Sequence, residues 1–150
     1  MVEWANSIDI RIANMMDKYC QFMLRISLAL IFIWFGILKP MGLSPEAELI
    51  KRTVYFISPD YFMPILGWWE VAIGIGLLFR PLLRMALLLL VIQLPGTFLP
   101  LILLPDICFT QIPFGLTIEG QYIIKNIFLI SAAFVIGSKV RSQNDGYRLL

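Results

Sequence analysis

Four apolar stretches, each about 20 residues long, limit what this chain can fold into. They cover residues 19–38, 61–79, 85–104 and 120–138. A helix rises about 1.5 Å per residue, so about 20 residues are needed to cross the roughly 30 Å hydrocarbon core of a bilayer. The chain is 59% hydrophobic and only 15% charged, which is too apolar for a soluble surface. We therefore expect one all-α domain over residues 1–150, an integral membrane four-helix bundle.

Two further helices are predicted outside these spans. Before the first span, apolar residues recur at helical spacing opposite charged ones, which is typical of an amphipathic helix lying in the membrane interface: Trp4, Ile8, Ile12, Met15 and Tyr19. This segment lacks the cleavage pattern of a signal peptide, so we expect the first span to be retained. Between the first and second spans, a helix start at Ser44-Pro45-Glu46 predicts a short surface helix over residues 45–57.

The positions of the basic residues predict the orientation of the spans. Seven lie on the side that holds both termini, namely Arg11, Lys18, Arg80, Arg84, Lys139, Arg141 and Arg148. Three lie on the opposite side, namely Lys39, Lys51 and Arg52, and the loop over residues 105–119 has none. Because cytoplasmic loops carry the excess of Lys and Arg, we expect the N- and C-termini to be cytoplasmic.

Several kinds of chemistry are disfavoured by what the chain lacks. It contains no histidine, and its two cysteines, Cys20 and Cys108, form no C-x-x-C pair. We therefore expect no metal site, no intrinsic haem and no dithiol centre. The basic residues are scattered rather than clustered, so nucleic acid is not an expected partner.

Charged residues inside the spans mark the candidate site, because such groups are expensive in hydrocarbon and need a partner or an escape route. Glu70 lies about 9 Å beyond Pro64, and Lys125 lies about 7.5 Å beyond Gly120 on a helix of the same direction. These similar depths favour a buried Glu70–Lys125 pair within a polar cluster in the outer half of the bundle. In the alternative, Lys125 extends outward to the interface, and Glu70 only neutralises this lysine or becomes protonated.

Two further polar residues within the spans each have an expected role. Arg25 is near the cytoplasmic boundary, where we expect it to reach the headgroups. Gln93 lies near the middle of the third span and is expected to hydrogen-bond across helices, either as a structural link or as a ligand contact. Gly67 and Gly74 are one heptad apart in the second span and predict close approach to a neighbouring helix.

Segments of all four spans together resemble the DoxX family of small bacterial membrane proteins. They are residues 32–39 (FIWFGILK), 69–78 (WEVAIGIGLL), 93–97 (QLPGT) and 116–126 (LTIEGQYIIKN). The resemblance implies a four-helix bundle in the bacterial cytoplasmic (inner) membrane. The residues that match the family pattern form the candidate ligand-binding set: Lys39, Glu70, Gln93, Glu119, Gln121, Lys125 and Asn126.

Three functions follow from these observations. In the first, the chain is an accessory subunit of a larger membrane complex, respiratory or otherwise electron-transferring, as the resemblance implies. In the second it is a quinone-binding redox component, whose catalytic role would be that of a quinone-linked oxidoreductase subunit. The third, a small-solute or proton pathway, is weakened by apolar residues between Arg25 and the outer polar residues. Expected partners are membrane lipids and a larger complex or further copies of the chain, and the expected ligands are quinone or lipid.

Overall fold

The computed structural model describes residues 2–54 and 57–146, and the side chains of residues 9–16, 19–54 and 57–138. Its elements in chain order are α1 (Val2–Leu38), α2 (Ala47–Thr53), α3 (Pro59–Leu78), η1 (Arg80–Leu82), α4 (Leu83–Leu103), α5 (Pro105–Cys108), β1 (Phe109–Gln111), β2 (Gly115–Leu116) and α6 (Ile118–Gly146). Within the described residues four helical segments are long and apolar enough to cross a membrane: Tyr19–Leu38, Pro59–Leu78, Arg80–Leu103 and Ile118–Ser138. They confirm the four predicted spans and support a multi-pass membrane protein.

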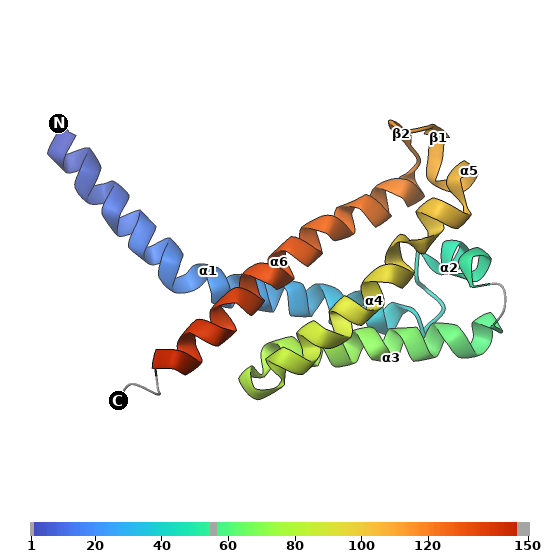
Figure 1. The fold of residues 1–150 in the computed structure, drawn as a ribbon, viewed down its shortest axis with the longest axis horizontal. Coiled ribbons are helices and arrows are strands. Elements are labelled where there is room, and N and C mark those ends of the chain that lie inside the picture. The colour runs from blue at the N-terminus through green and yellow to red at the C-terminus, as the bar shows by residue number, and fades with distance from the viewer. Residues whose placement is uncertain (1, 55–56, 147–150) are drawn as a thin grey trace.

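The four long helices form a ring around a shared core. Helix α1 packs along α3, α3 against α4, α4 against α6, and α6 against α1. Figure 1 shows that α1 begins and α6 ends at one end of the molecule, whereas α2, α5 and the two strands lie at the other, which we call the hairpin end. The largest buried cluster includes Leu28, Ile73, Leu77, Leu90 and Ile136, so every spanning helix contributes to it.

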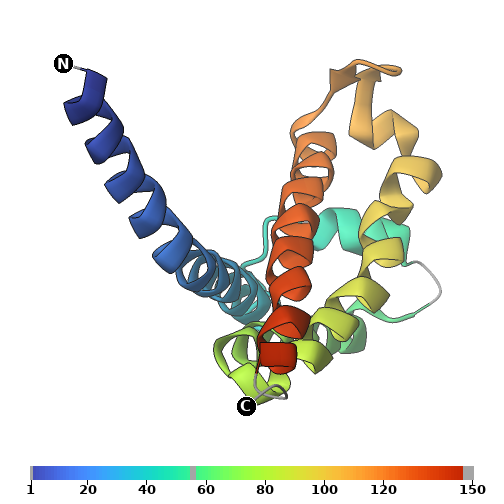
Figure 2. The ribbon, with the colours of Figure 1, turned by 60° about the vertical axis from the view of Figure 1, so that its left-hand side comes forward.

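The N-terminal segment and the first span form one continuous helix. Helix α1 runs without a break from Val2 to Leu38, so the predicted amphipathic helix and the first span are one element. The physical reason is local: residues 12–22 contain neither Gly nor Pro, so nothing in the sequence interrupts the helical hydrogen bonds. Figures 1 and 2 show the first part of α1 projecting away from the other helices.

Close backbone contact joins α1 to α3. A Cβ atom added at Gly67 would lie 2.5 Å from the carbonyl oxygen of Gly36, and one added at Gly74 would lie 2.6 Å from the side chain of Ile33. Small residues permit this approach, and the resulting contact is a recurrent device of membrane helix pairs. The prediction of close packing at Gly67 and Gly74 is therefore confirmed.

A glycine-capped turn leads from α1 toward the short helix α2. Gly42 has a φ of +72°, Gly42 N–H donates to Lys39 O (3.1 Å), and Leu43 N–H donates to Leu38 O (3.0 Å). This is a Schellman motif, which ends the helix and satisfies two of its last carbonyls. The short helix predicted over residues 45–57 is present but covers only Ala47–Thr53.

The hairpin end contains elements that the all-α prediction missed. Helix α5 is followed by an antiparallel pair, β1 and β2, in which Phe109 lies opposite Leu116. The strands have only three and two residues, so no alternation of apolar and polar residues announces them. Thr117 then starts α6: its hydroxyl accepts from Gly120 N–H (3.1 Å) and donates to Ile107 O (2.6 Å).

Candidate functional site

Four polar residues from different elements meet inside the bundle, and we call them the polar centre: Lys39, Glu46, Glu70 and Gln93. Lys39 Nζ donates to Glu70 Oε2 at 2.6 Å, and Gln93 Nε2 donates to Glu70 Oε1 at 2.9 Å. Lys39 Nζ also lies 3.6 Å from Glu46 Oε2. Both oxygens of Glu70 are thus engaged, one from the end of α1 and one from α4.

The polar centre lies deep in the bundle. Glu70 is 11 residues after Pro59, the first residue of α3, and Gln93 is 10 residues after Leu83, the first residue of α4. At about 1.5 Å per residue both lie roughly 15 Å along their helices, near the middle of each helix, whereas Lys39 directly follows α1 and Glu46 directly precedes α2. The side chain of Lys39 is 2% exposed, that of Glu70 10% and that of Glu46 32%.

The predicted Glu70–Lys125 pair is replaced by the Glu70–Lys39 pair. Lys125 is exposed, and its Nζ lies 5.5 Å from the centre of the Tyr122 ring. The depth estimate counted from Pro64, but α3 begins five residues earlier, so Glu70 is 11 residues into α3 and Lys125 is seven residues into α6. Depth also does not show toward which neighbouring helix a side chain points. The close packing of α1 against α3 brings the end of α1 beside Glu70.

The remaining predicted site residues are divided between the cavity walls and the exterior. Asn126 is half-buried and lines two cavities, and Lys125 lines one of them. Glu119 and Gln121 are exposed and belong to neither lining. Both come within the first four residues of α6.

Arg25 forms hydrogen bonds with the last turn of α3. Its Nε donates to Leu77 O (3.1 Å) and its Nη2 to Leu78 O (2.8 Å). These carbonyls belong to the last turn of α3, where no further helical N–H follows to satisfy them. The guanidinium therefore caps α3 and joins α1 to α3 at the end opposite the hairpin.

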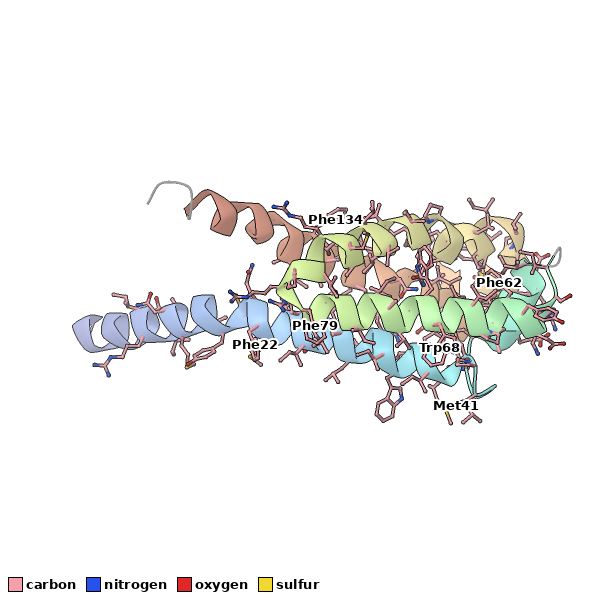
Figure 3. The ribbon with its side chains drawn as sticks, turned by 90° about the horizontal axis from the view of Figure 1, so that it is seen from below. Phe22, Met41, Phe62, Trp68, Phe79 and Phe134 are labelled. Carbon is pink, nitrogen blue, oxygen red and sulfur yellow. The ribbon has the colours of Figure 1, made fainter. Side chains whose placement is uncertain are left out.

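Two cavities flank the polar centre. Cavity 1, of about 360 Å³, lies among α2, α3, α4 and α6, and its apolar wall includes Phe62, which is labelled in Figure 3. Cavity 2, of about 460 Å³, lies among α1, α4 and α6. Both volumes fall within the range of about 300–1,000 Å³ usual for small-molecule sites. The residues that line both are Lys39, Glu46, Glu70, Gln93, Thr97, Tyr122 and Asn126.

Both cavities reach the apolar outer surface of the bundle. Ile65 and Ile92 line cavity 1 and are 64% and 57% exposed, and Phe128 lines cavity 2 and is 72% exposed. In a bilayer these side chains would face acyl chains. The cavities are therefore accessible to molecules dissolved in the membrane.

Residues that line cavity 1 carry buried polar atoms for which the described part of the chain provides no hydrogen-bond partner. They include the indole Nε1 of Trp69 and the amide Oε1 of Gln93. The orientation of the Gln93 amide follows from its neighbour, because the Glu70 carboxylate only accepts and must face the NH₂ group. Both atoms are fully buried, so a bound molecule would reach them only after neighbouring side chains moved.

Some lining residues were missed by the sequence-based site. Glu46 was interpreted only as a helix start, and Trp69 and Thr97 appeared only within the segments that resemble the DoxX family. The proximity of Glu46 to Lys39 along the chain was a usable signal, whereas the position of Trp69 depends on how α3 is rotated in the bundle.

Within the part of the chain that the structure describes, no three His, Cys, Asp or Glu residues are grouped so as to hold a metal ion. No known protein family, curated protein or solved structure matches this chain. Its function is therefore argued from the polar centre and the cavities.

Proposed function

We propose that this chain is an accessory subunit of a larger membrane complex and that it holds a quinone-type amphiphile in its cavities. The observation that carries the proposal is the buried Lys39–Glu70–Gln93 group between two cavities with apolar walls. Ionisable residues in the middle of a membrane helix are costly and are generally retained for function. A polar headgroup would meet the polar centre, and an apolar tail would extend between the helices.

The arrangement favours binding over a pathway through the membrane. On the side of the polar centre away from the hairpin, the bundle is filled by apolar side chains that include Leu28, Ile73 and Leu77. Beyond them Arg25 is engaged by the end of α3. A solute or proton would have no polar route through this core, whereas a membrane-dissolved ligand can enter from the side.

The proposal places the catalytic chemistry in a partner. The chain has no histidine with which to ligate haem, so in this view the electron carriers belong to another subunit. We further propose the bacterial inner membrane as the location, with both termini cytoplasmic, on the basis of the seven-to-three distribution of basic residues.

Fluorescence of Trp69 tests the binding proposal. The chain has four tryptophans, and replacing Trp4, Trp34 and Trp68 by Phe leaves Trp69 as the only reporter, within the wall of cavity 1. We expect a decyl-substituted benzoquinone to quench this variant saturably in nanodiscs. Quenching that rises linearly with quinone in the membrane, without saturation, would contradict a specific site.

A cavity-filling variant and a matched control sharpen this test. A Cβ at Gly96 meets no atom within 4 Å, so Gly96→Phe should place a ring in cavity 1 without displacing the helix. Ile102→Phe adds a ring on the same helix at a position 77% exposed and outside the described cavities. We expect saturable quenching to be lost only in Gly96→Phe. Extraction in mild detergent tests the accessory role, which predicts larger subunits in stoichiometric association.

A further inference from the structure

We infer that Arg25 and Arg80 bind the phosphate of an anionic phospholipid at the end of the bundle opposite the hairpin. The two arginines come from different elements: Arg25 lies in α1, and Arg80 begins the short helix η1 between α3 and α4. Neither residue lines cavity 1 or cavity 2. The inference therefore goes beyond the proposed function and does not depend on it.

The hydrogen bonds that Arg25 makes with α3 hold its guanidinium beside the segment that carries Arg80. Arg25 Nη2 donates to Leu78 O at 2.8 Å, and Arg80 follows Leu78 by two residues. Consecutive Cα atoms are about 3.8 Å apart, so the Cα atom of Arg80 lies within about 8 Å of that of Leu78. The two guanidinium groups are close enough to repel each other. The fold thus brings two positive charges together.

No acidic side chain that the structure describes neutralises this pair. The ion pairs among the described side chains include neither Arg25 nor Arg80. The described carboxylate nearest to them along α3 is that of Glu70, which lies eight residues before the end of the helix, or about 12 Å, and is bonded to Lys39. Arg84, four residues after Arg80, is also exposed and adds positive charge to this end of the bundle.

The guanidinium of Arg25 has donors to spare. Its Nε and Nη2 give two of five N–H groups to carbonyls of α3, so three are left over by the described contacts. The side chain of Arg80 is exposed. Guanidinium groups match the spacing of phosphate oxygens and bind them through paired, charge-assisted hydrogen bonds. A phosphate is therefore the ligand that these two residues are best suited to hold.

The site lies where the headgroup of a membrane phospholipid would be. Arg80 is the first residue of the third span, and Arg25 is the seventh residue of the first. Basic residues between membrane helices at this level are a recurrent binding site for anionic headgroups. Phe22 and Phe79 are 60% and 55% exposed and lie at this end of the bundle in Figure 3. They offer apolar surface to the acyl chains, while the phosphate would join α1 to the turn between α3 and α4.

Equilibrium binding of radiolabelled phosphatidylglycerol to the full chain in mild detergent tests the inference. Phosphatidylcholine with the same acyl chains is the reference ligand, because its quaternary ammonium cancels the charge of its phosphate. Each basic residue near an anionic headgroup contributes a factor of roughly five in affinity. We therefore expect phosphatidylglycerol to bind at least about fivefold more tightly than phosphatidylcholine.

Two variants locate the site. Arg80→Gln should weaken the binding of phosphatidylglycerol about fivefold and change that of phosphatidylcholine by less than about twofold. Lys51→Gln is the matched control, because it removes the same charge from an exposed position on α2 at the hairpin end. Its affinity for phosphatidylglycerol should stay within about twofold of that of the unmodified chain. If Arg80→Gln does not fold, the comparison of the two lipids on the unmodified chain decides by itself.

The contrary results are equally specific. Equal affinity for the two lipids, an unchanged affinity in Arg80→Gln, or an equal loss in Lys51→Gln overturns the inference. Inorganic phosphate, compared with sodium chloride at the same ionic strength, distinguishes the source of the phosphate group. Displacement of phosphatidylglycerol by phosphate but not by chloride overturns the assignment to a lipid in favour of a free phosphate, whereas failure of both to displace it supports the lipid.

Discussion

Replacing Lys39 by Met tests the assignment of the buried ion pair. The Lys39 side chain is 2% exposed and its Nζ lies 2.6 Å from Glu70 Oε2. Met has a similar length and no charge, so the substitution removes the ammonium with little change in packing. Glu70, with a side chain only 10% exposed, is then left with the Gln93 amide as its single donor among the described contacts.

Removing one partner of a buried pair costs about 3–5 kcal/mol, because an uncompensated charge remains in a medium of low polarity. For a chain of this size each kcal/mol corresponds to about 2–4 °C in melting temperature. We therefore expect Lys39→Met to lower the melting temperature by roughly 6–20 °C. The double variant Lys39→Met, Glu70→Gln should recover most of this loss, since a neutral amide oxygen still accepts from Gln93.

Lys125→Met is the matched control, because the same charge is removed from an exposed position on α6. The Lys125–Tyr122 contact is a cation–π interaction of 5.5 Å, worth about 0.5–1 kcal/mol at an exposed site. Thermal unfolding in detergent, followed by circular dichroism, measures all three variants. The reasoning is refuted if Lys125→Met loses as much stability as Lys39→Met, or if adding Glu70→Gln brings no recovery.

Three further predictions concern packing, capping and pH. Gly67→Ala should lower the free energy of unfolding by about 1–3 kcal/mol, because its Cβ would lie 2.5 Å from an α1 carbonyl oxygen. Gly96→Ala should raise the free energy of unfolding by up to about 1 kcal/mol, because the space around its Cβ is open. Similar melting temperatures for the two variants would contradict this reasoning. Arg25→Met should lower the free energy of unfolding by about 1.5–3 kcal/mol, because the charged donors to the last carbonyls of α3 are lost. Arg25→Lys should keep part of this stabilisation in the same thermal unfolding assay. Burial raises the pKa of the Cys108 thiol, and the carboxylate of Glu119 raises it further. The stability that the protonated thiol contributes is therefore fully present below the pKa of an unfolded cysteine, about 8.5, and is lost as the pH rises through the pKa in the folded state. Cys108→Ala should flatten that alkaline decline in chemical unfolding curves, and an unchanged slope would disprove the assignment.

The spans were predictable because their signal is local. Hydropathy predicted 61–79 and 85–104, and the helices cover Pro59–Leu78 and Leu83–Leu103. Errors of one or two residues at such ends reflect capping rather than composition. The same local signal failed at the hairpin, whose strands are too short to show a period.

The candidate site was only partly predictable. Lys39, Glu70 and Gln93 were correctly selected as polar residues within or beside the spans, but Glu70 was assigned to the wrong lysine. Counting residues along a helix estimates how deep a side chain lies but does not say toward which neighbouring helix it points. Which lysine faces Glu70 depends on the rotation of α3 and on the close approach of Gly36 to Gly67.

The amino-acid sequence by itself determined the number of spanning helices and the scarcity of charge within them. Each of those properties follows from backbone hydrogen bonding and side-chain polarity within a short stretch of sequence, and neither depends on how the helices pack together. Only the tertiary structure decided the partner of Glu70, the placement of Trp69 and Gln93 in one cavity, and the capping of α3 by Arg25. The hydrogen bond from Lys39 to Glu70 joins residues 31 positions apart, and the one from Arg25 to Leu78 joins residues 53 positions apart. Such contacts depend on how the helices rotate and approach one another.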